Sequence, residues 1–212
     1  MLKLQNVSVS YGSFIAVDNI SIDIKPGEIT TIYGHHGAGK SSLLKAIVGC
    51  VKHSGDISFN DKIIQNQKPH HLLKNGIAYM PEGRSVFGKM TISENLVLSA
   101  TLANSTITIS EAIAPFPALE TYINEKAFCL SGGQAQMLSF ARLLISNPKY
   151  LILDEPTLGL AEGPKQTILD TIIEQSNKQL GVLLVEQEFG SSCDFSNQIY
   201  EMVNGKIKRT LR

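Results

Sequence analysis

Residues 34–42, which read GHHGAGKSS, constrain the fold of this chain more than any other stretch. They follow a segment with the apolar pattern of a strand, GEITTIY, and they precede a segment with the spacing of a helix. The apolar positions of that helix are Leu43, Leu44, Ile47 and Val48, and Gly49 is its predicted end. A strand, a glycine-rich loop and a helix in this order place backbone N–H groups and a helix N-terminus beside an anion. The loop is therefore predicted to bind an anionic group.

The spacing of the glycines and the lysine identifies that anion as phosphate, because it matches the phosphate-binding loop GxxxxGK[ST]. Glycines let the backbone curl so that its N–H groups face phosphate oxygens. Lys40 is expected to neutralise the β- and γ-phosphate oxygens, and the Ser41 hydroxyl to be a ligand of Mg²⁺, while Ser42 caps or packs the helix. The residues of this loop that are predicted to bind the nucleotide are Gly34, His35, His36, Gly37, Ala38, Gly39, Lys40, Ser41 and Ser42.

Two other interpretations of the loop are weaker. A glycine-rich turn without a ligand does not account for the order of strand, motif and helix. A metal site at His35 and His36 is disfavoured because adjacent side chains in a curled loop point apart, and no third ligand stands at metal spacing nearby. Both histidines are expected at the surface of the loop.

Asp154 and Glu155 end an apolar segment, YLILDE. Such a segment reads as a strand of a parallel sheet that is buried on both faces. Carboxylates at the C-terminal edge of a parallel strand lie where ligands bind in such sheets. Asp154 is expected to hold Mg²⁺ through water and Glu155 to polarise the attacking water as general base. The alternative, a surface pair without a role, loses weight because a phosphate loop lies upstream in the same chain.

The rest of the chain alternates predicted strands and helices, which indicates the α/β class. Further strands are predicted at residues 77–80 and 181–187, and helices from Gln134 onward and around 165–178. A helical insert is placed at approximately 84–146. Since neither a repeat nor a linker is visible, residues 1–212 are predicted to form one domain.

Composition excludes several classes of protein. The chain is 43% hydrophobic and 18% charged, as in ordinary globular proteins, and its formal net charge of zero argues against nucleic acid as the main partner. The start lacks the pattern of a signal peptide, and no stretch approaches the roughly 18 apolar residues of a membrane span. If the protein acts at a membrane, another chain is expected to cross it.

The segment LSGGQ, residues 130–134, separates the families that share a phosphate loop. Where it opens a helix, Ser131 and the glycine amides offer a second anion site. At this place, shortly before YLILDE, it resembles the signature of ABC-type ATPases. The resemblance spans essentially the whole chain and implies a P-loop NTPase of ABC type, with a mixed sheet core, an antiparallel β subdomain and a small helical subdomain. It also implies a dimer in which Ser131, Gly132, Gly133 and Gln134 of one protomer close on the ATP that the other holds.

Other positions of that family can be compared one at a time. Tyr11, in SYGSF, stands where the family stacks an aromatic ring on adenine. Glu82 stands where glutamine is usual, Gln187 where histidine is usual, and Ala161 where aspartate is usual. The glutamate and the glutamine are typical of a subgroup, the second ATPase of branched-chain amino acid importers, which the chain resembles through YG, PEGRSVF, LGLA and LLVEQ.

The three departures from the broader family have distinct chemical consequences. Gln187 can donate an amide N–H to a γ-phosphate oxygen but carries no positive charge. Glu82 can accept a proton or hydrogen bond from the attacking water or from a Mg²⁺-bound water, at the cost of another negative charge near phosphate. Ala161 loses a polar contact across the dimer. We expect hydrolysis to persist, because the phosphate loop and both carboxylates after YLIL are intact.

The resemblance implies an ATP-binding and hydrolysing subunit of an importer for branched-chain or related amino acids, with ATP and Mg²⁺ as cofactors. It implies a peripheral protein at the cytoplasmic face of the inner (plasma) membrane. The implied partners are membrane permease subunits, a second copy or a sibling ATPase, and indirectly an external solute-binding protein. Alternatives are an importer for urea or short amides and a soluble ABC ATPase outside transport. Val86, Phe87 and Met90 either fill the core of the insert or line a groove for a helix of the membrane subunit.

Overall fold

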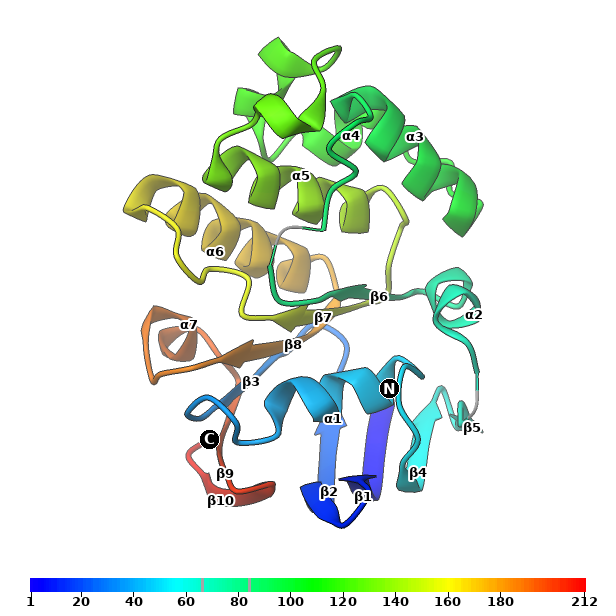
Figure 1. Cartoon of the computed structure of the whole chain (residues 1–212), viewed down its shortest axis with the longest axis vertical. Helices are drawn as coiled ribbons and strands as arrows, with labels where there is room; N and C mark the ends of the chain where they lie inside the picture. Colours follow the sequence, from blue (N-terminus) through cyan, green and yellow to red (C-terminus); the bar gives the residue numbers. More distant parts are fainter. Residues whose placement is uncertain (66, 84) are drawn as a thin grey trace.

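The computed structural model describes residues 1–65, 67–83 and 85–212. Their strands form two sheets, and the helices lie between the sheets and on the far side of the larger one (Figure 1). None of the helices in these ranges is both long and apolar enough to cross a bilayer.

The larger sheet has the strand order β10-β9-β3-β8-β7-β6 in the described part of the chain. Its strands are β3 (Ile29–Tyr33), β6 (Ile77–Met80), β7 (Tyr150–Asp154), β8 (Gly181–Glu186), β9 (Gln198–Val203) and β10 (Lys206–Thr210). Neighbouring strands are parallel except for β9 and β10, which form an antiparallel hairpin. β7 is buried along its whole length, as its continuous apolar sequence predicts for a parallel strand with both faces covered. The predicted mixed sheet is confirmed.

The smaller sheet is antiparallel, with the order β2-β1-β4-β5. Its strands are β1 (Leu2–Tyr11), β2 (Phe14–Ile24), β4 (Ser54–Phe59) and β5 (Lys62–Ile63). In β1 the apolar residues Leu2, Leu4, Val7 and Val9 are buried and face the interior. This sheet is the antiparallel subdomain that the family resemblance implies.

Helix α1 (Lys40–Ile47) lies between the two sheets (Figure 1). Leu43, Leu44 and Ile47 are fully buried in a core that contains side chains from both sheets. Burial of each such aliphatic side chain contributes about 1.5–3 kcal/mol. The packing therefore holds the start of α1, and the loop that precedes it, at the carboxyl end of β3.

The opposite face of the larger sheet is covered by α5 (Gly132–Leu144) and α6 (Glu162–Asn177). Beyond α5 lie α3 (Ile92–Ala103), α4 (Ile109–Ile113) and the 3-10 turns η1 (Pro117–Tyr122) and η2 (Ala127–Cys129). Helix α5 begins at Gly132, before the predicted start at Gln134, because Ser131 and Gln134 form a capping box that includes the two glycines. All of these elements except α6 fall inside the proposed insert at 84–146, whose first residue lies outside the described residues.

Two short helices were not predicted from the sequence. They are α2 (Pro69–Lys74), which leads into β6, and α7 (Ser191–Asp194), which follows β8. Both are shorter than two helical turns, so their sequences carry too few apolar positions to show a helical period.

Candidate functional site

The carboxyl ends of β3, β7, β8 and β6 bring together most of the predicted site residues. The phosphate loop follows β3, Asp154 ends β7, Glu155 follows it, and Gln187 follows β8. Since β3, β8, β7 and β6 are consecutive parallel neighbours, the segments that leave them meet at one edge of the sheet. Residues that are far apart in the sequence therefore share one site.

The phosphate loop has a backbone that only glycine permits at Gly39. This residue has a φ of 103°, and a Cβ atom there would lie 2.1 Å from the carbonyl oxygen of Ala16 in β2. The Lys40 Nζ atom donates to the carbonyl oxygens of Gly34, at 2.5 Å, and His35, at 3.1 Å. The loop thus curls around a lysine side chain that is only 4% exposed. His35 and His36 are exposed, as predicted.

Asp154 is linked to the first turn of α1. The Ser41 hydroxyl donates to Asp154 Oδ1 at 3.1 Å, and the Tyr79 hydroxyl donates to Asp154 Oδ2 at 3.4 Å. Burial raises the pKa of Asp154, and the hydrogen bond from Ser41 opposes this effect. Mg²⁺ prefers oxygen ligands, and the Ser41 hydroxyl and the Asp154 carboxylate offer such oxygen atoms next to each other. The residues present therefore fit this ion. Tyr79 is a contact that the sequence analysis missed, although its place on the strand IAYM was predicted.

Glu155 is held by two side chains from other elements. Its Oε1 lies 3.6 Å from Lys40 Nζ, and its Oε2 accepts a hydrogen bond from Gln187 Nε2 at 2.7 Å. Its backbone φ is 50°, in the left-handed region that costs a non-glycine residue about 1–3 kcal/mol. Such strain occurs at sites where surrounding structure fixes a side chain for function. Here the surroundings fix a buried carboxylate beside the phosphate loop.

A second carboxylate, that of the partly buried Glu186, was also missed. Its Oε1 accepts a hydrogen bond from Thr157 Oγ1 at 3.1 Å, and its backbone carbonyl accepts from the N–H of Gly34 at 3.2 Å. Burial raises its pKa from 4.5 to about 7, and the hydrogen bond from Thr157 opposes the rise. Its position just before Gln187, at the end of an apolar strand, was the available signal.

Tyr11 and Glu82 lie at the rim of the site. The Tyr11 hydroxyl donates to Ser42 Oγ at 3.4 Å, so the turn between β1 and β2 reaches the start of α1. Glu82 follows β6 and is exposed. Burial has the largest effect on the pKa of Asp154, followed by the hydrogen bond from Ser41. The negative charges of Glu155 and Glu82 raise this pKa further, so Glu82 lies near the Asp154 carboxylate.

The LSGGQ segment is separate from these residues within one chain. Ser131 Oγ accepts from the N–H of Gln134 at 3.3 Å, and Gln134 Oε1 accepts from the N–H of Ser131 at 2.9 Å. No hydrogen bond or ion pair joins the segment to the phosphate loop among residues 1–65, 67–83 and 85–212. Ser131 and Gln134 instead hydrogen-bond to each other at the start of α5.

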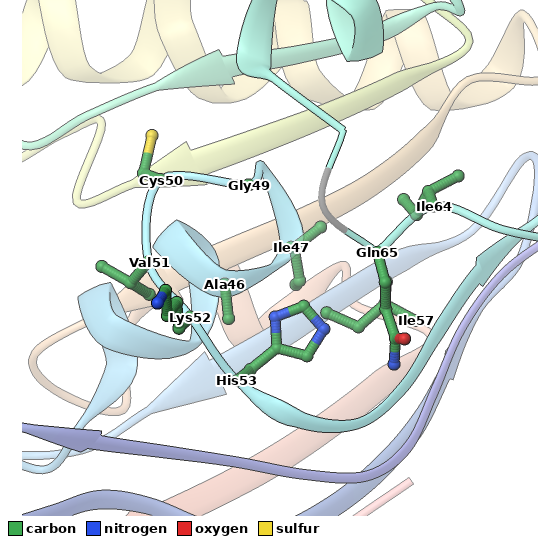
Figure 2. A pocket seen from close by; sticks show the side chains of 10 residues that line it. All are labelled: Ala46, Ile47, Gly49, Cys50, Val51, Lys52, His53, Ile57, Ile64 and Gln65. Carbon is green, nitrogen blue, oxygen red and sulfur yellow. The ribbon is translucent and has the colours of Figure 1, made fainter.

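A cavity of about 530 Å³ lies elsewhere, near the C-terminal end of α1 (Figure 2). It contains none of the predicted site residues. His53 is one of the residues that line this cavity (Figure 2). Both nitrogens of its imidazole ring are covered by protein and have no hydrogen-bond partner among the described residues. These nitrogens cannot contact a ligand in the present arrangement.

Comparisons with known proteins agree on one family. Residues 17–158 match the model of the family described as ABC transporter. The chain is 35% identical to the high-affinity branched-chain amino acid transport ATP-binding protein BraG of Pseudomonas aeruginosa, over 98% of this chain and 91% of that protein. It is also 35% identical to the probable branched-chain amino acid transport ATP-binding protein LivF of Archaeoglobus fulgidus, over 98% and 90%.

A solved structure supports the same grouping. The fold superimposes on the ADP conformation of MJ1267, an ATP-binding cassette of an ABC transporter, with a TM-score of 0.89 and 28% identity. The match covers 100% of this chain and 91% of that one.

Proposed function

Because the chain belongs to the ABC transporter family, in which it is an ATPase subunit, we propose that it binds ATP with Mg²⁺ and hydrolyses it to drive import. The proposed cargo is a branched-chain or related amino acid. The cargo and the direction rest on the similarity to BraG and LivF. The observation that carries the proposal is that two neighbouring residues of the phosphate loop contact both carboxylates. Lys40 lies beside Glu155, and Ser41 donates a hydrogen bond to Asp154.

The proposed reaction is attack of water on the γ-phosphoryl group. When ATP binds, the Lys40 ammonium group donates hydrogen bonds to β- and γ-phosphate oxygens in place of the loop carbonyls. Its positive charge then stabilises the negative charge that develops on these oxygens during the reaction. Ser41 and Asp154 would hold Mg²⁺, which supplies further neutralisation of the phosphate oxygens when bound. Glu155 polarises the attacking water as general base, and the Gln187 amide keeps its carboxylate in position. Glu82, at the rim, is a second acceptor for a water of the site.

The other half of the proposed site comes from a second copy or a sibling ATPase. The LSGGQ segment begins helix α5, and the N-terminus of this helix presents backbone amides that suit phosphate. We place Ser131, Gly132, Gly133 and Gln134 of one protomer over the ATP of the other. ATP binding closes this dimer and hydrolysis reopens it.

The proposed contact with the membrane permease subunits lies near the start of the helical insert at 84–146. Phe87 is 46% exposed, and the guanidinium of Arg142 stacks on its ring with 4.7 Å from the Arg142 carbon to the ring centroid. Val86 packs against the core, so it favours the filling role, whereas Phe87 is available to a helix of a permease. With such partners, the chain is a peripheral protein at the cytoplasmic face of the inner membrane, and an external solute-binding protein acts on it indirectly.

Two alternatives share the same ATPase chemistry. One is an importer for urea or short amides, and the other is a soluble ABC ATPase outside transport. Purification from membranes distinguishes the second, because a transporter subunit is recovered with polytopic membrane proteins and a soluble ATPase is not.

Substitution of Glu155 by glutamine tests the ATPase proposal. E155Q keeps the size of the side chain but removes the general base, so ATP binding should persist while phosphate release falls by about 10²–10⁴-fold. E120Q, which changes an exposed glutamate in the helical region, is the matched control and should leave turnover unchanged. Phosphate release by E155Q at the wild-type rate would exclude Glu155 as the base.

A further inference from the structure

The turn between β1 and β2 presents two aromatic residues side by side. Tyr11 on β1 pairs directly with Phe14 on β2. Their side chains are 48% and 62% exposed, respectively. Directly opposite residues of an antiparallel pair point to the same face of the sheet, with Cβ atoms about 4.5–5.5 Å apart.

The strand register shows which face this is. Val9 is fully buried in the core around α1, and Tyr11, two residues later, shares its face. The pairs are Val9 with Val17, then Ser10 with Ile15, so Ala16 is an extra residue in β2 and forms a bulge. Beyond the bulge, Phe14 faces α1 together with Tyr11, and Ile15 faces the other way.

This face adjoins the phosphate loop at two independent points. The Tyr11 hydroxyl donates to Ser42 Oγ at 3.4 Å, in the first turn of α1. Ala16, two residues after Phe14, has its carbonyl oxygen 2.1 Å from where a Cβ of Gly39 would be, so the start of β2 touches the loop itself. The rings of Tyr11 and Phe14 therefore lie beyond the loop, on the side of the β1–β2 turn.

Single exposed apolar side chains are common on protein surfaces and do not by themselves indicate a binding site. Two aromatic rings on one face, next to a loop built for phosphate, have a specific use, because a purine offers a flat π-surface that stacks on aromatic side chains. We propose that Phe14 is a second aromatic contact for the base of the bound nucleotide, in addition to Tyr11. The inference rests on the proposed ATP binding and adds a residue that sets affinity for the base.

The test compares ATP with inorganic tripolyphosphate, which has the phosphates but no base. Dissociation constants are measured by calorimetry on nucleotide-free protein in EDTA, so that hydrolysis does not interfere. F14A should weaken ATP binding by about 5- to 20-fold, within the range for loss of one aromatic–base stack, and leave tripolyphosphate within twofold. I15A is the matched control, because Ile15 is 54% exposed in the same turn but faces away. It should change neither constant.

A fluorescence measurement gives a second readout, because the chain contains no tryptophan. F14W introduces a single indole, whose emission should change on addition of ATP but not of tripolyphosphate, whereas I15W should respond to neither. Wild-type affinity of F14A for ATP, or equal loss of both ligands, would overturn the role of Phe14. If the wild type binds neither ligand even when Mg²⁺ replaces EDTA, the proposed function fails and the inference fails with it.

Discussion

Substitution of Glu186 by glutamine should stabilise the protein at alkaline pH and have little effect at acid pH. The carboxyl has a pKa of about 7 in the folded chain, raised from 4.5 by burial. A raised pKa means that the folded state holds the proton more tightly than the unfolded state. This tighter binding of the proton stabilises the folded state. The stabilisation is complete below pH 4.5 and is lost as the pH rises through 7. Glutamine cannot ionise, so the variant avoids this loss while its carbonyl can still accept the hydrogen bond from Thr157.

The magnitude follows from the two pKa values. The two pKa values differ by 7 − 4.5 = 2.5. At about 1.4 kcal/mol for each pKa unit, this difference gives an upper limit of about 3.5 kcal/mol. Because Glu186 keeps partial contact with solvent, screening reduces this figure, and we expect about 2 kcal/mol at pH 8. For a chain of this length, that corresponds to a rise of about 4–8 °C in Tm. At pH 5 the gain should be under about 0.5 kcal/mol.

The assay is urea unfolding of nucleotide-free protein in EDTA at pH 5 and pH 8. The groups that act on Glu186 are Glu155, which raises its pKa, and Lys165 and Lys40, which lower it, so the ionic strength is kept constant. E188Q removes a neighbouring exposed carboxylate and is the control, for which no pH-dependent gain is expected. An E186Q gain that is equal at both pH values, or absent at pH 8, would refute the reasoning.

Two further substitutions follow from the structure. Q187A removes the 2.7 Å hydrogen bond that holds Glu155, so ATP turnover should fall by about 10- to 100-fold with nearly unchanged ATP affinity. Phosphate release and a binding titration measure these two effects, and unchanged turnover would contradict a positioning role. A161D should stabilise the fold by about 1 kcal/mol, because Ala161 is the N-cap of α6 with a φ of −66°, a ψ of 159° and no side-chain cap. Thermal unfolding checks this, with A161V as a control that should show no gain.

Local rules of sequence explain much of the fold. The apolar patterns on either side of residues 34–41 predicted a strand and a helix, and the glycine spacing predicted the loop between them. The structure has β3, the loop and α1 in that order. The apolar run before Asp154 predicted a buried parallel strand, which is β7. These features were accessible because strand burial, helical period and the backbone freedom of glycine depend on neighbouring residues. The limits of helices were less accurate, since the capping box of α5 and the early start of α6 include residues without apolar periodicity.

The sequence by itself determined the chemical types at the site, because a phosphate loop and a terminal pair of carboxylates carry their functions in residue identity and spacing. Only the tertiary structure decided how the side chains meet. The order of strands sets β8 between β3 and β7, and this puts Gln187 against Glu155 and Glu186 against Thr157. No local pattern encodes that order, since it results from the packing of segments separated by many residues. For the same reason, the pairing of Tyr11 with Phe14 beside the phosphate loop became visible only once the strands were in register.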